Sequence, residues 1–465
     1  MSRLKVIQNG EEKILEFTGS VLLREILTRN GYFVPQPCGG KGKCGKCRVT
    51  VNGKEERSCS YVLTGDATVL LPDREVIFSV TGGDESGKRT KNVCLCLDIG
   101  TTTLALALVS LDEKCIIRTL TAPNPQRTFG ADVISRIEYC TKNGVGELQA
   151  VLLQRIREMV GQLLDRFSLD GVERMYVAGN TTMLHLLFGA DCTALGVSPY
   201  TPAFLESRRA DLGIPGVGEV ISLPGISAFV GADIVAGIHY VGAPAKGGCR
   251  LLLDLGTNAE MALFDGKKIL CTSAAAGPCF EGANISCGMS AGEGAVCACS
   301  ISGGYTVIGG GTAKGICATG LIDVIADGLR REWIDDTGCL EDDTLPVCHG
   351  LSLTKQDIRE FQLAKAAIRG AIECLLHRAG IGFADVEGFY VAGGFSAGIN
   401  AKNAAFVGLF PKELAGKFYG INNASLLGTV KLACAGDTPA LPDAEYVDLA
   451  ADTRFAELFV KYMAF

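Results

Sequence analysis

Two similar stretches decide the fold: "VCLCLDIGTTTLALALVS" at residues 93–110 and "RLLLDLGTNAEMALFDGKK" at residues 250–268. Each is an apolar run that ends in Asp, a hydrophobic residue, Gly and Thr, and that is followed by a second apolar run. This pattern predicts a buried strand, a tight polar turn and another strand. Asp98 and Asp254 occupy the same place in the two stretches. The chain therefore carries an internal repeat, which indicates its architecture.

A second pair of stretches completes the repeat. "YVAGNTTMLHLL" at residues 176–187 follows the first turn, and "YVAGGFSAGINA" at residues 390–401 follows the second. Each predicts a short strand that runs into Gly and then into a helix. Two halves of this kind, facing each other, enclose a cleft.

The residue types of these turns suit a bound nucleotide. Turns that present backbone N–H groups and hydroxyls can cradle phosphates, and carboxylates at strand ends can hold Mg²⁺ through its waters. Consecutive glycines let the backbone approach a flat purine and ribose. One such turn is equally compatible with an ordinary hairpin, whereas two copies before two Gly turns favour ATP with Mg²⁺. The candidate residues are Asp98, Gly100, Thr101, Thr102 and Thr103 in the first half, and Asp254, Gly256, Thr257, Asn258, Gly393, Gly394 and Ser396 in the second.

The N-terminal part carries a different motif, four cysteines spaced C-x5-C-x2-C-x11-C. Four thiolates are what a [2Fe–2S] cluster requires, and the plant-type spacing is C-x4-C-x2-C…C. Here the first gap is one residue longer and the fourth cysteine comes sooner. A structural zinc site also takes four cysteines, but it usually lies between two CxxC pairs, and the motif contains one. We therefore expect Cys38, Cys44, Cys47 and Cys59 to hold a [2Fe–2S] cluster.

The elements expected around this motif come in the order strand, strand, helix, metal loop and strand, which resembles the β-grasp fold of plant-type ferredoxins. Alternating apolar residues flank Asn9-Gly10, and a second Asn-Gly pair occurs at residues 52–53; both are hairpin signals. Ser20 precedes a short apolar helix pattern and is a candidate N-cap. The stretch after this module is rich in Gly, Ser and charge, which is typical of a flexible linker. The predicted domains are the ferredoxin at residues 1–80, the linker at 81–92, and two halves of an ATPase core at 93–248 and 249–465.

Composition narrows the function further. A net charge of -7 argues against general nucleic-acid binding. No signal peptide and no apolar run of about 18 residues is visible, so we expect a soluble, cytoplasmic protein without a membrane partner. The 20 cysteines then point to metal ligation and reduced thiols, which suit an anaerobic or strongly reducing cytosol. The histidines show no metal-ligand spacing and are expected in core or surface roles: His185, His239, His349 and His377.

The second module resembles the acetate-kinase, sugar-kinase, Hsp70 and actin superfamily, whose core is a duplicated ribonuclease-H-like domain. "DIGTTT" corresponds to its phosphate-one loop, "DLGTN" to phosphate-two and "AGGFS" to its adenosine turn. The fold class is therefore α/β, with an α+β front module. In that superfamily an acid on the helix before phosphate-two lies at the γ-phosphate, which implies Asp233 in "AFVGADIVAGIHY" as the residue that orients or deprotonates water. The alternative is a helix N-cap role for Asp233.

The chain as a whole resembles the reductive activators of corrinoid-dependent methyltransferases. The resemblance spans nearly all residues and includes "NPQRTFGADVISRI", "GNTTMLHLLFG", "PYTPAF" and "GPCFEGANISCGM". It implies ATP-dependent, one-electron reduction of Co(II) to Co(I) in a corrinoid protein of one-carbon metabolism, with the [2Fe–2S] cluster as electron source and a low-potential donor behind it.

One departure from that family concerns the middle of the chain. Large members carry a long linker and a middle domain between ferredoxin and ATPase, whereas here only residues 81–92 intervene. Because the middle domain carries dimerisation in such members, a homodimer of this chain stays an open alternative to a monomer.

The corrinoid partner needs a docking surface, and the Gly-rich stretch "AGPCFEGANISCGMSAGEG" at residues 276–294 is the candidate. The alternative is that its glycines line the nucleotide cleft and that its thiols belong to the core. The residues expected to face the corrin are Ser286, Cys287, Met289 and Ser290.

Three other functions stay open at this stage. An ATP-dependent activator of a dehydratase-type enzyme would share the ATPase fold, but would use a [4Fe–4S] cluster between two subunits and no β-grasp module. A redox-sensing module would use ATP only as a conformational switch, which the intact phosphate turns and Asp233 disfavour. A sugar kinase fused to a ferredoxin leaves the cluster unexplained.

Overall fold

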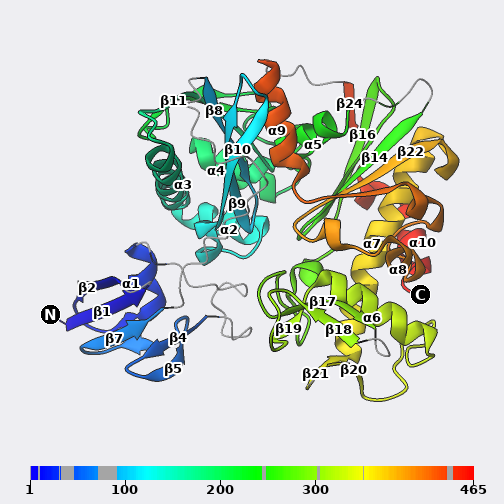
Figure 1. The fold of residues 1–465 in the computed structure, drawn as a ribbon, viewed down its shortest axis with the longest axis horizontal. Coiled ribbons are helices and arrows are strands. Elements are labelled where there is room, and N and C mark those ends of the chain that lie inside the picture. Colours follow the sequence, from blue (N-terminus) through cyan, green and yellow to red (C-terminus); the bar gives the residue numbers. More distant parts are fainter. Residues whose placement is uncertain are drawn as a thin grey trace. The chain divides into compact units, whose positions relative to one another are not determined.

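The computed structural model describes residues 2–8, 11–30, 32, 47–71, 92–242, 244, 248–300, 304–348, 350–436 and 443–465 (Figure 1). The chain forms two compact units, Met1–Leu223 with Ala433–Thr438 and Pro224–Leu432 with Pro439–Phe465. The first unit holds a five-stranded and a six-stranded sheet, and the second holds another six-stranded sheet. Most of the predicted linker lies outside the described residues. None of the described helices is long and apolar enough to cross a membrane.

The N-terminal module is a five-stranded sheet in the order β2-β1-β7-β4-β5 with one helix. Alternation along β1 buries Leu4 and Val6, which pack with Val51 and Val69 of neighbouring strands. This mixed sheet with one helix is the β-grasp arrangement expected from the sequence. Its elements are β1 (Ser2–Gln8), β2 (Glu11–Phe17), β3 (Val21–Leu22), α1 (Leu23–Arg29), β4 (Arg48–Val51), β5 (Lys54–Arg57), β6 (Val62–Leu63) and β7 (Ala67–Leu70).

Local signals in this module have mixed outcomes. Asn52 and Gly53 have φ values of 49° and 81°, so the second Asn-Gly pair forms the predicted hairpin turn between β4 and β5. The first pair, Asn9-Gly10, lies outside the described residues. The Ser20 N-cap prediction is wrong, because Val21–Leu22 pairs with β6 and the helix begins only at Leu23.

The first six-stranded sheet has the order β10-β9-β8-β11-β13-β12. Its central strand β8 is buried on both faces, which explains the nearly continuous apolar run before Asp98. The strands are β8 (Val93–Ile99), β9 (Thr103–Ser110), β10 (Cys115–Pro123), β11 (Val172–Gly179), β12 (Arg209–Ala210) and β13 (Val217–Ser222); the helices are η1 (Pro125–Thr128), α2 (Val133–Asn143), α3 (Gly146–Phe167) and α4 (Thr181–Phe188).

The second six-stranded sheet has the order β23-β22-β14-β15-β16-β24. Helix α7 packs on it through a fully buried face that includes Phe361, Ile368 and Leu375. The strands are β14 (Cys249–Leu255), β15 (Ala259–Phe264), β16 (Lys268–Ala274), β22 (Val386–Ala392), β23 (Phe418–Ile421) and β24 (Asp443–Tyr446); the helices are α5 (Ala232–Val241), α7 (Lys355–Ala379), α8 (Ala401–Phe406), α9 (Ala424–Ala435) and α10 (Thr453–Lys461).

The two six-stranded sheets repeat one plan. Three antiparallel strands come first, and a fourth strand then pairs in parallel with the first of them. The register agrees to the residue, since Asp98 pairs with Ala178 and Asp254 pairs with Ala392. The internal repeat and the duplicated α/β fold are therefore confirmed.

Helix α5 belongs to the second unit, although it precedes the second repeat in the sequence. Gly237 lies against the sheet, where an added Cβ would be 2.6 Å from Leu252 Cδ2. The compact unit therefore begins at Pro224, before the position 249 expected for the second half.

A smaller subdomain lies between β16 and α7 in the sequence and begins within the Gly-rich stretch. It combines a three-stranded sheet, a helix and a hairpin, drawn in green to yellow below the second large sheet in Figure 1. Its elements are η3 (Pro278–Glu281), β17 (Ala295–Ser300), β18 (Gly304–Val307), β19 (Gly315–Ile316), α6 (Ala318–Arg330), β20 (Thr344–Cys348) and β21 (Leu351–Thr354).

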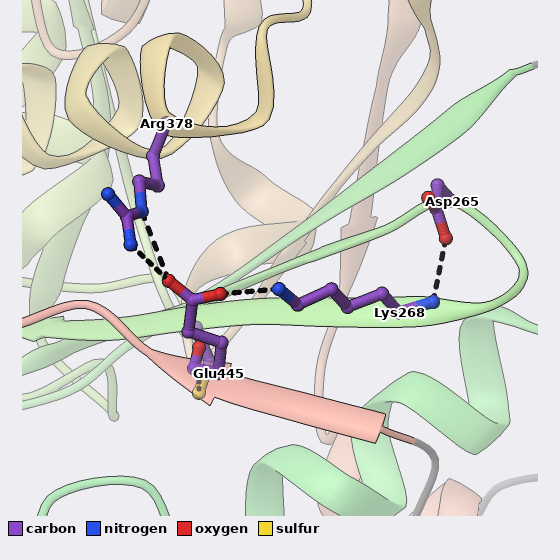
Figure 2. Close-up of polar contacts among 5 residues, drawn as sticks. Asp265, Lys268, Arg378 and Glu445 are labelled. Atoms are coloured by element: carbon purple, nitrogen blue, oxygen red, sulfur yellow. Dashed lines mark hydrogen bonds and ion pairs between the residues drawn. The ribbon is translucent and has the colours of Figure 1, made fainter.

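The edge strand β24 is fixed by one carboxylate. Figure 2 shows Glu445 between Lys268 of β16 and Arg378 of α7, with Arg378 Nη2 donating to Glu445 Oε1 over 2.8 Å. Asp265 Oδ1 accepts the backbone N–H of Lys268 over 2.8 Å at the turn before β16. The hydrogen bonds from Lys268 and Arg378 lower the pKa of Glu445. These contacts join the last strand of the sheet to the helix that covers it.

Candidate functional site

The two described cysteines of the N-terminal motif lie together. Cys47 Sγ is 3.2 Å from Cys59 Sγ, and both side chains are buried with free thiols. The backbone N–H of Ser58 donates to the Cys47 carbonyl over 2.9 Å, which holds the two segments side by side. Cys38 and Cys44 lie outside the described residues.

This geometry fits two ligands of an iron–sulfur cluster. Neighbouring thiols at this separation can bind one metal atom as thiolates. The buried Ser58 hydroxyl, next to Cys59, has no hydrogen-bond partner within the described part of the chain. The Ser58 hydroxyl is therefore an available hydrogen-bond donor beside a candidate cluster ligand, and cluster sulfurs accept such hydrogen bonds.

The phosphate-one turn after Asp98 requires glycine. The N–H of Gly100 donates to the Thr103 carbonyl over 3.0 Å, and a Cβ at residue 100 would lie 2.7 Å from that oxygen. The Thr101 hydroxyl accepts from Asn180 Nδ2 over 3.0 Å. Asn180 is also the N-cap of α4. The turn and the first Tyr-Val-Ala-Gly stretch are thus brought together.

A buried polar network supports this turn from behind. Asn124 donates through its backbone N–H to Thr102 over 2.9 Å and through Nδ2 to the Gly100 carbonyl over 2.8 Å. Arg136, fully buried, donates through Nη2 to the Thr101 carbonyl over 2.5 Å. The stretch "NPQRTFGADVISRI" therefore fixes three consecutive carbonyls of the turn, a role that the sequence alone did not reveal.

The phosphate-two turn has a partner of its own. The N–H of Gly256 donates to the Asn258 carbonyl over 2.9 Å. The Thr257 hydroxyl donates to Glu281 Oε2 over 2.9 Å. Glu281 is the last residue of η3 and lies in the first part of the stretch predicted to face a partner, residues 276–294. One predicted nucleotide residue therefore contacts the beginning of that stretch.

The Gly393-Gly394 turn packs on the end of β14. Gly393 has φ 118°, and a Cβ there would lie 2.3 Å from the Leu255 carbonyl oxygen. At Gly394 an added Cβ would meet no atom within 4 Å, so this position has free space beside it. Ser396 is fully buried, and its hydroxyl lies 2.9 Å from the Gly393 carbonyl and 2.5 Å from that of Ile421. Ser396 thus fixes the turn from inside.

Asp233 lies in the first turn of α5, near two other acids. The N-cap of α5 is Gly231, so the N-cap alternative for Asp233 is wrong. Glu260 pairs with Asp254 across β14 and β15. Burial, followed by the charges of Asp233 and Asp254, raises the pKa of Glu260 well above its usual range. Negative charge therefore gathers at this end of the second sheet.

Glu260 was not singled out from the sequence. The available signal was a carboxylate within the apolar strand "AEMALF", at the position that an antiparallel hairpin places opposite Asp254. Among the residues that the structure describes, no three His, Cys, Asp or Glu side chains are close enough to hold a metal ion directly.

The predicted partner-facing residues sit on a tightly folded loop. Ser286 and Ser290 are exposed, whereas Cys287 and Met289 are half-buried. Burial and then the charge of Asp357 raise the pKa of Cys287 to about 11. The Met289 N–H donates to the Ile316 carbonyl over 2.9 Å. The loop therefore exposes Ser286 and Ser290, and the raised pKa keeps the Cys287 thiol protonated near neutral pH.

His185 has a core role, as expected. Its Nδ1 lies 2.7 Å from the Thr181 carbonyl, and its Nε2 accepts the Ala203 N–H over 2.9 Å. Its ring stacks on Phe204 with centroids 4.4 Å apart. This neutral imidazole joins α4 to the "PYTPAF" stretch. Burial lowers its pKa. His349 lies outside the described residues.

Three family models match consecutive parts of the chain. The 2Fe-2S iron-sulfur cluster binding domain matches residues 6–71. The RACo middle region matches residues 93–245, and the C-terminal domain of RACo, the ASKHA domain, matches residues 248–465. A region described as the middle of the family thus follows the linker directly, although the sequence led us to expect no middle domain.

Two curated relatives and one solved structure extend this likeness. The corrinoid activation enzyme RamQ of Eubacterium limosum is 29% identical over 411 residues, which cover 79% of this chain and 69% of that protein. The [Co(II) methylated amine-specific corrinoid protein] reductase of Methanosarcina barkeri is 29% identical over 378 residues, 71% of this chain and 68% of that protein. The structure of a reductive activator for corrinoid, iron-sulfur protein has a TM-score of 0.71 and 24% identity, and the match covers 99% of this chain and 98% of that one.

The fold and the cysteine pair define a class: a [2Fe–2S] ferredoxin domain followed by an actin-, Hsp70- and sugar-kinase-like domain. Within that class, the two RACo models match residues 93–245 and 248–465, which together make up most of the chain. The chain belongs to this RACo family.

Proposed function

We propose that this protein uses ATP to drive the one-electron reduction of Co(II) to Co(I) in a corrinoid protein. The observation that carries the proposal is the presence, on one chain and in RACo order, of an adjacent buried cysteine pair and two matched Asp-x-Gly-Thr turns. The names of the two curated relatives, an activation enzyme and a Co(II) corrinoid protein reductase, support the same reaction.

The four cysteines would hold the cluster, which supplies one electron at a time at low potential when bound. A low-potential donor returns that electron to the ferredoxin domain. We place the reaction in the cytoplasm, where thiols stay reduced, and every described cysteine has a free thiol. A homodimer is not required by this scheme.

ATP would bind at the two phosphate turns. The backbone amides and hydroxyls of the turns would hold the phosphates, and Asp98 and Asp254 would hold Mg²⁺ through waters. Asp233, in the first turn of α5, would orient the attacking water. Burial, and then the charges of Asp233 and Asp254, raise the pKa of Glu260 well above its usual range, which disfavours a further negative charge beside these carboxylates.

Energy is the reason that one chain needs both sites. A one-electron step costs about 1.4 kcal/mol for each 59 mV of unfavourable potential difference. Binding that distinguishes two states shifts their equilibrium by the difference in affinity. We infer that docking of the corrinoid protein on the loop at residues 276–294 favours the reduced cobalt, and that ATP hydrolysis releases the product complex.

The test is a direct assay under anaerobic conditions. The chemically reduced full chain is mixed with a Co(II) corrinoid protein, with and without MgATP, and the Co(I) absorbance is followed. We expect Co(I) to form only with MgATP. Equal Co(I) formation in both mixtures, or none with any corrinoid protein from a methyltransferase system, contradicts the proposal.

Spectroscopy and metal analysis test the cluster separately. We expect two iron and two sulfide per chain and a [2Fe–2S] electron paramagnetic resonance signal on reduction. A [4Fe–4S] signal would instead favour an activator of a dehydratase-type enzyme, and zinc without sulfide would exclude electron transfer by this module.

A further inference from the structure

The contact between Thr257 and Glu281 joins two parts of the second unit that the proposed function treats separately. Thr257 belongs to the phosphate-two turn, and Glu281 lies in the predicted partner-facing stretch at residues 276–294, directly before the loop that carries the predicted corrin-facing residues. We propose that Glu281 is a positioning residue that transmits the state of the nucleotide site to this loop, here residues 282–290. The inference rests on the proposed function and adds a route by which ATP regulates partner docking.

The first step of the proposed relay is a competition between two acceptors for the hydrogen of the Thr257 hydroxyl. The Thr257 hydroxyl has a single hydrogen, which it donates to Glu281 Oε2 over 2.9 Å. A nucleotide phosphate on the phosphate-two turn offers a charged acceptor for that same hydrogen. Glu281 and the phosphate cannot both receive it, and their negative charges repel each other. Phosphate binding therefore favours an arrangement in which the Glu281 carboxylate moves away from Thr257.

Close packing prevents the loop from absorbing that movement. Gly282 has φ 78°, and a Cβ there would lie 2.5–2.6 Å from backbone atoms of Met289. A Cβ at Gly288 would lie 2.5 Å from the Gly282 carbonyl oxygen. The Ser290 hydroxyl lies 3.5 Å from the Glu281 carbonyl oxygen. Displacement of residue 281 therefore displaces residues 288–290, which include two of the predicted corrin-facing positions.

The middle of the loop is held in place by a different contact. Asp357, which is 2% exposed, accepts the Ser286 N–H through Oδ1 over 2.7 Å and the Ser286 hydroxyl through Oδ2 over 2.5 Å. The Thr354 N–H donates to Asp357 Oδ2 over 2.7 Å as part of the N-terminal cap of α7. Ser286 is thus held in place by Asp357, whereas Ser290, at the end of the loop, moves with Glu281.

Amide hydrogen exchange tests the relay without a corrinoid protein. The full-length holoprotein is compared with and without the non-hydrolysable analogue Mg·AMP-PNP, and exchange is followed in peptides that cover residues 282–294. We expect the analogue to change the exchange rate of these amides about fivefold or more in the wild type, the lower end of ordinary coupling between sites. In Glu281→Ala the change should fall below about twofold.

Two further variants separate a relay from a structural role. Glu281→Gln keeps the size and one acceptor oxygen but loses the charge, and should retain an intermediate change. Glu360→Ala is the matched control: Glu360 Oε2 accepts from Asn284 Nδ2 over 3.4 Å and so touches the same loop without contact to Thr257 in the described hydrogen bonds. It should retain the full change.

The nucleotide affinity, measured by titration with a fluorescent ATP analogue, identifies which idea fails. If the wild type binds no nucleotide, the proposed function is wrong and the relay with it. If the wild type binds nucleotide but residues 282–294 exchange equally with and without it, only the relay is wrong. A Glu281→Ala protein that binds nucleotide within about threefold of wild type and keeps the full exchange response also overturns the relay.

Discussion

Single residues that contribute no side-chain chemistry determine the geometry of this site. Gly393 and Gly394 are neighbours in one turn, yet only Gly393 has positive φ and only its added Cβ would strike the Leu255 carbonyl. The sequence indicated both glycines as nucleotide contacts. The structure distinguishes a residue required for close packing from one with open space, a difference that depends on residues 138 positions apart in the chain.

We predict opposite outcomes for two neighbouring substitutions. Gly393→Ala should lower the free energy of unfolding by about 2–4 kcal/mol, because it combines an unfavourable φ with a backbone clash. Gly394→Ala should change it by less than about 1 kcal/mol, since no atom lies near its added Cβ. Urea unfolding of both variants checks this. Equal destabilisation would show that the turn is not held against β14 as described.

A second prediction concerns pH and His185. The pKa of His185 is lowered chiefly by burial, and its unfolded value is about 6.5. The unfolded chain therefore binds a proton that the folded chain resists, so that stability is full above pH about 6.5 and falls as the pH is lowered further. His185→Gln keeps a donor and an acceptor without titrating.

The free energy of unfolding of His185→Gln should accordingly fall less than that of the wild type between pH 7 and pH 5. Urea titrations at both pH values give the comparison. His239, whose pKa is lowered by burial and by Lys431, adds a dependence of the same sign and is present in both proteins. Parallel losses in the two proteins would mean that His185 is protonated in the folded state.

At the scale of elements, the two Asp-x-Gly-Thr hairpins could be predicted from the sequence. The side chains that hold the turns of these hairpins in place could not. Alternation of apolar residues and the Gly-Thr turn are local signals, so β8, β9, β14 and β15 follow from the sequence. The stretch "NPQRTFGADVISRI" has no local signal for its role. Arg136 acts on the carbonyl of Thr101, 35 residues away, and only the folded chain brings them together.

This support yields a prediction at the same scale. Arg136→Lys should lower the free energy of unfolding by about 2–4 kcal/mol and weaken nucleotide binding, because lysine cannot reach the Thr101 and Gly130 carbonyls with a planar fork. Arg157→Lys is the control, since the exposed Arg157 also donates to a glycine carbonyl, that of Gly213, over 3.1 Å. It should shift stability by less than about 0.5 kcal/mol.

Thermal unfolding and titration with a fluorescent ATP analogue measure both effects. If Arg136→Lys bound nucleotide as tightly as Arg157→Lys, the buried network would be a stability element without influence on the phosphate-one turn.

At the scale of the whole molecule, duplication made the fold of the two large sheets predictable. The subdomain between β16 and α7 was not predicted from the sequence. In a repeat, each weak sequence signal occurs twice. The repeat is visible in the structure because Asp98 and Asp254 occupy the same register position in their sheets. The segment at residues 295–354 has no counterpart in the first half. The segment forms short strands, and its position depends on long-range contacts such as the hydrogen bond that Asn403 Nδ2 donates to Asp323 Oδ1 over 2.7 Å.

Because two sites lie on one chain, a final prediction is that substitutions can remove the function of either site separately. Cys59→Ala removes a buried thiol 3.2 Å from Cys47 and should abolish the cluster signal and Co(I) formation, while ATP hydrolysis persists. Asp254→Asn leaves the ferredoxin domain untouched and should keep the cluster signal, but lower ATP-dependent Co(I) formation by on the order of 100-fold. Iron content, electron paramagnetic resonance, phosphate release and Co(I) absorbance are measured on each variant. Because one reaction needs both contributions, the loss of either one alone slows or abolishes Co(I) formation. Co(I) formation at the wild-type rate by Asp254→Asn would mean that the nucleotide site does not drive the electron transfer.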